Sequence, residues 1–105
     1  VMYLADSLGS KNVRVNAISA GPIKTLAAAG ISGFNKILEI YEKKSPIKKN
    51  ITTDDVAKVA NFLLSDYSNA ITGQIIYVDN GFNIIGYWLR YSSLTIISYL
   101  SYLDK

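Results

Sequence analysis

The chain has 105 residues, half of them hydrophobic, which is enough for one small domain. Its net charge of +3 comes without a dense basic stripe interleaved with aromatic residues, so the sequence does not indicate a nucleic-acid-binding protein. It contains no cysteine and no histidine, which excludes disulfides, thiolate nucleophiles, histidine general bases and the usual zinc sites, and we expect no metal site.

The first predicted elements are a helix and a strand. The apolar residues of a helical pattern begin at Val1 itself, so residues 1–8 are expected to be the last turns of an amphipathic helix whose earlier turns precede Val1. Gly9 is the predicted C-cap, because glycine tolerates a positive φ. Residues 13–19 are rich in β-branched and apolar side chains and predict a strand covered on both faces. This strand is expected to end at residues 20–22.

Two further helices and a second strand are predicted in the rest of the chain. From Phe34 the apolar spacing becomes that of one helix face, and Pro46 ends this helix. Thr52 and Asp55 match a capping box at the start of the next helix. The buried face of that helix is expected to comprise Val56, Val59, Ala60, Leu63 and Leu64. Residues 74–78 are a second β-rich run closed by a polar turn.

The order helix, strand, long crossover with helices, and strand predicts an α/β fold with a parallel sheet. Ligands of such sheets bind where the strands end at their carboxyl side, which indicates residues 20–25. In this segment Gly21 lets the backbone approach a flat ligand closely, and Pro22 fixes the turn. The hydroxyl of Thr25 is suited to a phosphate.

One segment carries a specific family resemblance. Residues 17–31, AISAGPIKTLAAAGI, resemble the loop after the sixth strand of bacterial enoyl-acyl-carrier-protein reductases, oxidoreductases of the short-chain dehydrogenase/reductase superfamily. The resemblance continues through SPIKKNITTDDVAKVANFLLSD and ITGQIIYVDNGFNIIG, so it covers roughly residues 1–86. The VDNG ending is shared across the superfamily. The pair Ala20-Gly21, where generic reductases usually carry Pro-Gly, and the run TLAA are the specific part.

The resemblance implies a fold and an activity. Residues 1–86 would form the C-terminal part of a Rossmann-like doubly wound parallel sheet, two strands plus helices, within a three-layer α/β/α domain in the full enzyme. The implied reaction belongs to fatty acid biosynthesis and lipid metabolism. In it, NADH or alternatively NADPH reduces the trans-2 double bond of an enoyl group carried by acyl carrier protein. The full enzyme would be a homotetramer.

The resemblance also assigns roles to residues of this segment. It implies that the backbone of Ile23 meets the nicotinamide carboxamide, that Pro22 borders the nicotinamide ring, and that Thr25 meets the pyrophosphate. The implied cofactor-binding residues are Gly21, Pro22, Ile23, Thr25 and Ala27. The implied lining of the acyl and inhibitor pocket is Ala27, Ala28, Ile31 and Phe34. Without the resemblance, these positions are ordinary turn and helix residues of an α/β domain.

The family's catalytic tyrosine and lysine are expected upstream of Val1, and no glycine-rich pyrophosphate turn follows a strand in this chain. We therefore expect no catalytic residue here, and the isolated chain is predicted to be inactive. Tyr41 and Lys48 have the separation of the family's tyrosine and lysine, but Pro46 between them breaks the helix that would present both. Tyr41 is instead predicted to pack in the core and Lys48 to lie in solvent.

Five lysines are candidates for docking the acidic acyl carrier protein. Lys36 is the best single candidate, because it follows Phe34 on the same helix. The alternative is a solvated face with no partner. The set comprises Lys36, Lys43, Lys44, Lys48 and Lys49.

Two other functions stay open at this point. The chain could come from another short-chain dehydrogenase/reductase, such as a ketoacyl reductase or a sugar dehydrogenase. It could also be a non-catalytic remnant that acts only by association through its last strand and helix. No signal peptide precedes Val1, which favours a cytoplasmic location.

Residues 87–105, YWLRYSSLTIISYLSYLDK, have no counterpart in the resemblance. Arg90 and the serines interrupt a stretch that is already shorter than a usual transmembrane helix, so no membrane span is expected. We predict an atypical apolar tail from an added or altered terminus, with a helix lying on a membrane surface as the alternative.

Overall fold

The computed structural model describes residues 1–85. The apolar tail predicted at residues 87–105 lies outside the described residues and stays a prediction. Along the chain the elements are α1 (Met2–Gly9), β1 (Ala17–Ala20), α2 (Leu26–Ala29), α3 (Phe34–Lys44), α4 (Thr53–Leu64), the 3-10 turn η1 (Asp66–Ser68) and β2 (Ile75–Val78).

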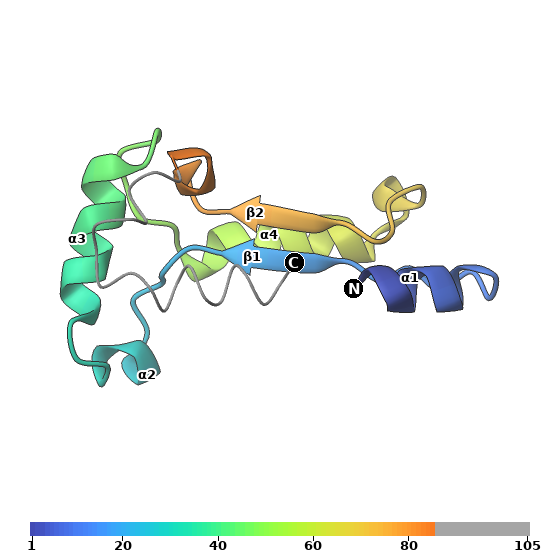
Figure 1. Cartoon of the computed structure of the whole chain (residues 1–105), viewed down its shortest axis with the longest axis horizontal. Helices are drawn as coiled ribbons and strands as arrows, with labels where there is room; N and C mark the ends of the chain where they lie inside the picture. Colours follow the sequence, from blue (N-terminus) through green and yellow to red (C-terminus); the bar gives the residue numbers. More distant parts are fainter. Residues whose placement is uncertain (86–105) are drawn as a thin grey trace.

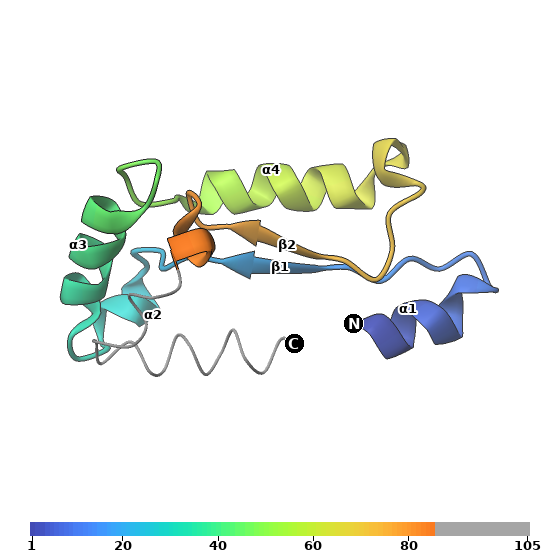
Figure 2. The same cartoon turned by 45° about the horizontal axis from the view of Figure 1, so that its top comes forward.

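The two strands form a parallel sheet, in which Ala17 lies opposite Ile75 and Ala20 lies opposite Val78. Figures 1 and 2 show α4 lying along one face of this sheet, while α1 continues beyond the amino end of β1. The helices α2 and α3 lie beyond the carboxyl ends of the strands. The predicted α/β fold with a parallel sheet is therefore confirmed.

The strand predicted from Val13 begins later, at Ala17. Before Ala17 the two chain segments are still joined by one backbone bond, from the Gly73 N–H to the Val15 carbonyl at 2.8 Å. The Asn16 side chain adds two more, because its amide nitrogen donates to the Ile71 carbonyl at 2.9 Å and its oxygen accepts from the Gln74 N–H at 3.0 Å. The residues of β1 are half-buried except Ala20, which is exposed, and Val13 before the strand is 44 % exposed. The prediction of a strand covered on both faces is thus wrong for the described residues.

The end of α1 also differs from the prediction. Gly9 is the last residue of the helix, and the C-cap is Ser10 in a right-handed helical conformation. The left-handed residue of the following turn is Asn12, with φ 59°. Asparagine visits this region more readily than other residues with a side chain, so the turn does not need a glycine.

The capping box at the start of α4 is confirmed. The Thr52 hydroxyl accepts from the Asp55 N–H at 3.2 Å, and the Asp55 carboxylate accepts from the Thr52 N–H at 2.8 Å. The bond from the Thr52 backbone is the main reason why the pKa of the Asp55 carboxyl is lowered. Leu63 is buried as predicted, but Leu64 is 86 % exposed. Each residue turns the helix by about 100°, so the rotation that buries Leu63 carries Leu64 away from the strands.

The partly buried side chain of Arg14, just before β1, forms hydrogen bonds to the end of α4. Arg14 Nη2 donates to the carbonyls of Leu63 at 2.9 Å and Ser65 at 3.3 Å, and Nη1 donates to the Ile71 carbonyl at 3.2 Å. A positive charge at a helix C-terminus is favourable, because the last carbonyls of the helix have no partner within it.

Replacing Arg14 with methionine is expected to lower the free energy of unfolding by about 2 kcal/mol, because three charge-assisted hydrogen bonds are lost while the apolar stem is kept. Urea denaturation followed by far-UV circular dichroism measures this change. The matched control is Lys11→Met, which removes an exposed charge and should leave the midpoint nearly unchanged. Equal shifts for the two variants would contradict this role of Arg14.

Among residues 1–85, no helix combines the length and the apolar character needed to cross a lipid bilayer.

Candidate functional site

The predicted site is the turn that follows β1, at the carboxyl end of the sheet. The Gly21 N–H donates to the Val78 carbonyl at 2.9 Å, which extends the pairing of the strands by one residue. Pro22 and Ile23 are half-buried, and Thr25 is exposed. The structure thus places the turn at the edge where parallel sheets bind their ligands.

The space beside Gly21 is filled by the chain itself. A Cβ atom at this position would lie 3.3 Å from both Cα and Cβ of Asp79, and 3.5 Å from Cε1 of Tyr41. Contacts of 3.3 Å are tighter than ordinary van der Waals packing, so a larger residue would have to displace its neighbours. The prediction explained Gly21 by a flat ligand, whereas packing within the chain is enough to explain it. Its contact with a cofactor stays a prediction.

Asp79 holds the turn that follows β2. This carboxylate is 9 % exposed, and its two oxygens accept from the N–H groups of Gly81 at 3.0 Å and Asn83 at 2.9 Å. The Phe82 N–H also donates to the Asp79 carbonyl at 3.1 Å. Asp79 was not predicted, because this segment indicated only the superfamily. The available signal was an aspartate two residues before a glycine, which is typical of a side-chain-stabilised turn.

Tyr41 of α3 lies over this turn. Its ring stacks on Phe82 with centroids 3.8 Å apart, and the two residues are 5 % and 3 % exposed. Burial, and secondarily the charge of Asp79, raise the pKa of Tyr41 to about 12. Lys48 is exposed and lies beyond the end of α3 at Lys44. Tyr41 therefore packs in the core and Lys48 lies in solvent, as predicted.

The raised pKa of Tyr41 gives a test at high pH. The folded state keeps the phenol proton between the ordinary tyrosine value near 10 and about 12, while the unfolded state loses it there, so stability should fall as pH rises through this interval. Thermal denaturation from pH 9 to 12 should therefore show a steeper loss for the natural chain than for Tyr41→Phe. Tyr67→Phe is the matched control, because Tyr67 is 92 % exposed. Parallel curves for the natural chain and Tyr41→Phe would contradict this assignment.

The residues predicted to line an acyl pocket follow the turn. Thr25 caps α2, because its hydroxyl oxygen accepts from the Ala28 N–H at 3.2 Å. Ala27 and Ile31 are exposed, while Ala28 and Phe34 are half-buried. These positions lie in one continuous segment, which comprises α2, the bend at Ile31 and the first turn of α3.

The helix α2 and its Leu26 were missed in the sequence. Leu26 is 97 % exposed and lies next to the residues predicted to line an apolar pocket. A threonine before a run of alanines is the signal that predicts a short capped helix here. Leu26 is therefore a further candidate for contact with an apolar ligand.

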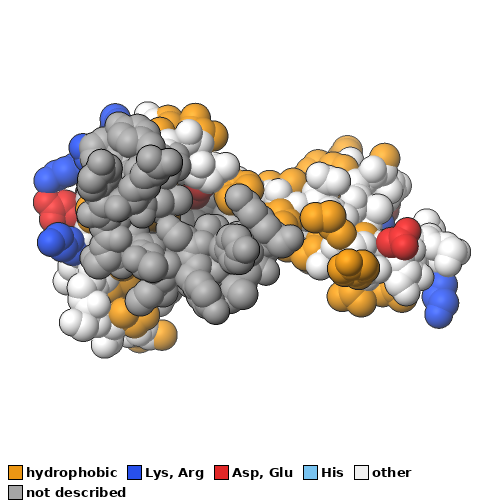
Figure 3. Space-filling model, viewed as in Figure 1, with side chains coloured by type: hydrophobic (Ala, Val, Ile, Leu, Met, Phe, Trp, Pro, Cys, Tyr) orange, Lys and Arg blue, Asp and Glu red, His pale blue; other side chains and the backbone are white. Residues whose placement is uncertain are grey.

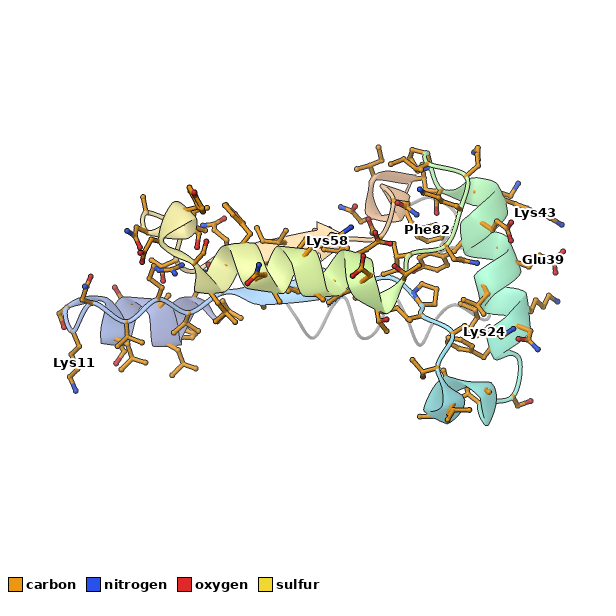
Figure 4. All side chains as sticks on the ribbon, turned by 180° about the vertical axis from the view of Figure 1, so that it is seen from behind. Lys11, Lys24, Glu39, Lys43, Lys58 and Phe82 are labelled. Atoms are coloured by element: carbon orange, nitrogen blue, oxygen red, sulfur yellow. The ribbon has the colours of Figure 1, made fainter. Side chains whose placement is uncertain are left out.

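The lysines of α3 are partly neutralised. Lys43 lies 2.6 Å from the Glu39 carboxylate, one helical turn away, and both side chains are well exposed. This hydrogen bond is the largest cause of the raised pKa of Lys43 and the lowered pKa of Glu39. Figure 3 shows basic side chains with an acidic one among them at the edge formed by α3, and Figure 4 shows Glu39 and Lys43 side by side there. Lys36 is exposed near the other end of the same helix.

Comparison with known proteins extends over most of the chain. A family model described as enoyl-(acyl carrier protein) reductase matches residues 1–83. The chain is 54 % identical over 86 residues to the enoyl-acyl-carrier-protein reductase (NADH) of Rickettsia typhi, covering 82 % of this chain and 33 % of the relative. It is also 54 % identical over 85 residues to the NADPH enzyme of Staphylococcus aureus, covering 81 % and 33 %.

Solved structures give the same result. The Bacillus cereus enoyl-acyl carrier protein reductase with NADP+ and indole naphthyridinone superposes with a TM-score of 0.78 at 48 % identity, covering 82 % of this chain and 34 % of that one. The reductase of Anaplasma phagocytophilum in complex with NAD superposes with a TM-score of 0.76 at 49 % identity, covering 82 % and 33 %. The chain spans about a third of the length of the curated relatives it matches. By its family match and its fold, the chain belongs to the enoyl-acyl-carrier-protein reductase family.

Proposed function

We propose that the chain is part of an NADH- or NADPH-dependent enoyl-acyl-carrier-protein reductase of fatty acid biosynthesis. In this enzyme residues 21–25 form one wall of the nicotinamide site, and residues 26–34 form a wall of the acyl site. The observation that carries the proposal is the family match over residues 1–83, because it includes both segments. The position of the turn at the carboxyl end of a parallel sheet supports it.

The residues of the turn fit the roles proposed for them. The backbone of Ile23 would bind the carboxamide of the nicotinamide, and Pro22 would border the ring. The Thr25 oxygen accepts from the Ala28 N–H, so its own proton stays free to donate to the pyrophosphate. Relatives are known with NADH and with NADPH, and both remain within the proposal.

The chemistry of the proposed reaction is a reduction of a carbon–carbon double bond. When bound, the nicotinamide supplies the hydride that adds to the β-carbon of a trans-2-enoyl thioester, and a proton completes the α-carbon. No catalytic residue is assigned within residues 1–85. We therefore propose that the chain alone turns over no substrate. A homotetramer and a cytoplasmic location are parts of the same proposal, and they rest on family membership.

A chimera tests the proposed function. Residues 1–85 would replace the matching segment of the Rickettsia typhi reductase, and NADH consumption would be followed with a short trans-2-enoyl thioester. The expected result is enoyl-dependent turnover by the chimera and none by the isolated chain. Turnover of a 3-ketoacyl thioester or a sugar without enoyl turnover would instead support another short-chain dehydrogenase/reductase. A folded chimera that reduces no substrate would support a non-catalytic remnant.

The carrier protein is proposed to dock near Lys36. Charge reversal, Lys36→Glu, in the chimera should raise KM for an enoyl group on acyl carrier protein by about threefold to tenfold, because an attraction to an acidic partner becomes a repulsion. KM for a short thioester should not change, since it lacks the acidic protein. Lys11→Glu is the matched control, because Lys11 is exposed at the opposite end of the molecule (Figure 4). An equal effect on both substrates would count against docking at Lys36.

A further inference from the structure

The turn after β2 is the point where three distant segments meet. Gly21 approaches Asp79 from the end of β1, and Tyr41 covers Phe82 from α3. A third segment, between α3 and α4, joins through Ile47, whose N–H donates to the Asn80 carbonyl at 3.1 Å. The position of the turn after β1 therefore depends on how α3 packs against the turn after β2.

Tyr41 is the residue of α3 that reaches Gly21. Its ring is fixed on one side by Phe82, and Ile37, Ile40 and Ile85 pack around the pair. A Cβ atom at Gly21 would lie 3.5 Å from Tyr41 Cε1, so the ring edge faces Gly21 and leaves little room beside it. A flat aromatic ring held in this way has little freedom to move, and it limits the movement of the backbone beside it.

The same helix begins at the segment proposed to bind the acyl group. Phe34 is the first residue of α3, seven residues before Tyr41, and this spacing places both residues on one face of the helix. Tyr41 thus links the start of α3 to the turn after β1. The phenol of Tyr41 is buried, and its raised pKa keeps it protonated.

We propose that Tyr41 is a positioning residue. Its ring fixes the turn at Gly21–Ile23 against Asp79 and thereby sets the position of this turn relative to the acyl-site end of α3. The expected effect on the cofactor rests on the proposed function. The position of the turn against Asp79 does not, because it depends only on contacts within this chain.

Hydrogen exchange on the whole 105-residue chain tests the seating of the turn. The Gly21 N–H, bonded to the Val78 carbonyl at 2.9 Å, reports on the turn directly. In Tyr41→Leu its exchange should be about tenfold faster, relative to the amides within α4, because one wall of the turn is lost. Tyr41→Phe keeps the ring and should restore slow exchange. Tyr67→Leu removes an exposed tyrosine and should change nothing.

The comparison with α4 separates positioning from general stability. A loss of overall stability would accelerate Gly21 and α4 equally, and that result would overturn the proposal. If Tyr41→Leu does not fold, Tyr41→Met fills the space with a flexible side chain, and the same difference between Gly21 and α4 is expected. Unchanged exchange at Gly21 in Tyr41→Met would overturn the proposal as well.

Cofactor binding separates the position of the turn from its proposed role at the nicotinamide. In the chimera, Tyr41→Leu should raise Kd for NADH, measured by its fluorescence, by about tenfold, and Tyr41→Phe should not. Faster exchange at Gly21 with an unchanged Kd would support the seating of the turn and overturn its proposed cofactor role. An unchanged rate at Gly21 would overturn the positioning role whatever the Kd.

Discussion

Replacing Gly81 with alanine is expected to destabilise the chain by about 3 kcal/mol or more, because two independent costs fall on one residue. Gly81 has φ 86°, in the left-handed region that residues with a side chain rarely adopt. A Cβ atom there would lie 2.9 Å from Cγ and 3.2 Å from Cδ of Pro46, which are atoms of a rigid ring. Urea denaturation of the variant and of the natural chain measures the loss.

Variants of two other glycines separate the cost of the backbone strain from the cost of the contact with Pro46. Gly33 has φ 80° and nothing within 4 Å of its Cβ position, so Gly33→Ala should cost only the strain of the backbone, about 1 kcal/mol. Gly9 lies at the end of α1 without a positive φ and with no close neighbour, so Gly9→Ala should be neutral or slightly stabilising. Equal losses for Gly81→Ala and Gly33→Ala would show that the contact with Pro46 is not tight.

The second large effect is expected at Thr25. In the chimera, Thr25→Val should raise KM for NADH by about tenfold to a hundredfold, because a hydrogen bond to a charged pyrophosphate contributes about 1.5–3 kcal/mol. Valine has nearly the shape of threonine but cannot donate a proton. Turnover at saturating NADH should fall much less, because the hydroxyl is proposed to bind the cofactor and not to take part in the chemistry.

Thr25→Ser provides the matched control, since serine keeps both the proton and the ability to cap α2. The Thr25 oxygen accepts from the Ala28 N–H at 3.2 Å, so valine also removes the cap of this short helix. A fall in turnover with unchanged KM for NADH would point to the lost cap and contradict the role at the pyrophosphate.

The elements that the sequence predicted well depend on local patterns. The capping box of Thr52 and Asp55 and the end of α3 before Pro46 are set by residues within a few positions of each other. The parallel order of the strands followed from their separation by helices. The place of the turn followed in the same way, because parallel strands end at one edge of the sheet.

The parts that it missed depend on contacts between distant residues. Gly21 is explained by Asp79 and Tyr41, and no spacing along the chain indicates that these three residues meet. Just before the late start of β1, the Asn16 side chain bonds to a segment far along the chain, and no local pattern indicates these bonds. The exposure of Leu64 depends on which face of α4 meets the strands. Leu63 and Leu64 are adjacent apolar residues, and their sequence alone does not indicate which of them faces the strands.

The most direct test of the central claim is the position of the nicotinamide in a crystal structure of the chimera with NAD+. The proposal predicts the carboxamide at hydrogen-bonding distance, about 3 Å, from the backbone of Ile23, with the ring beside Pro22. A nicotinamide bound at another edge of the sheet, away from residues 21–25, would contradict the claim that this turn forms the wall of the cofactor site.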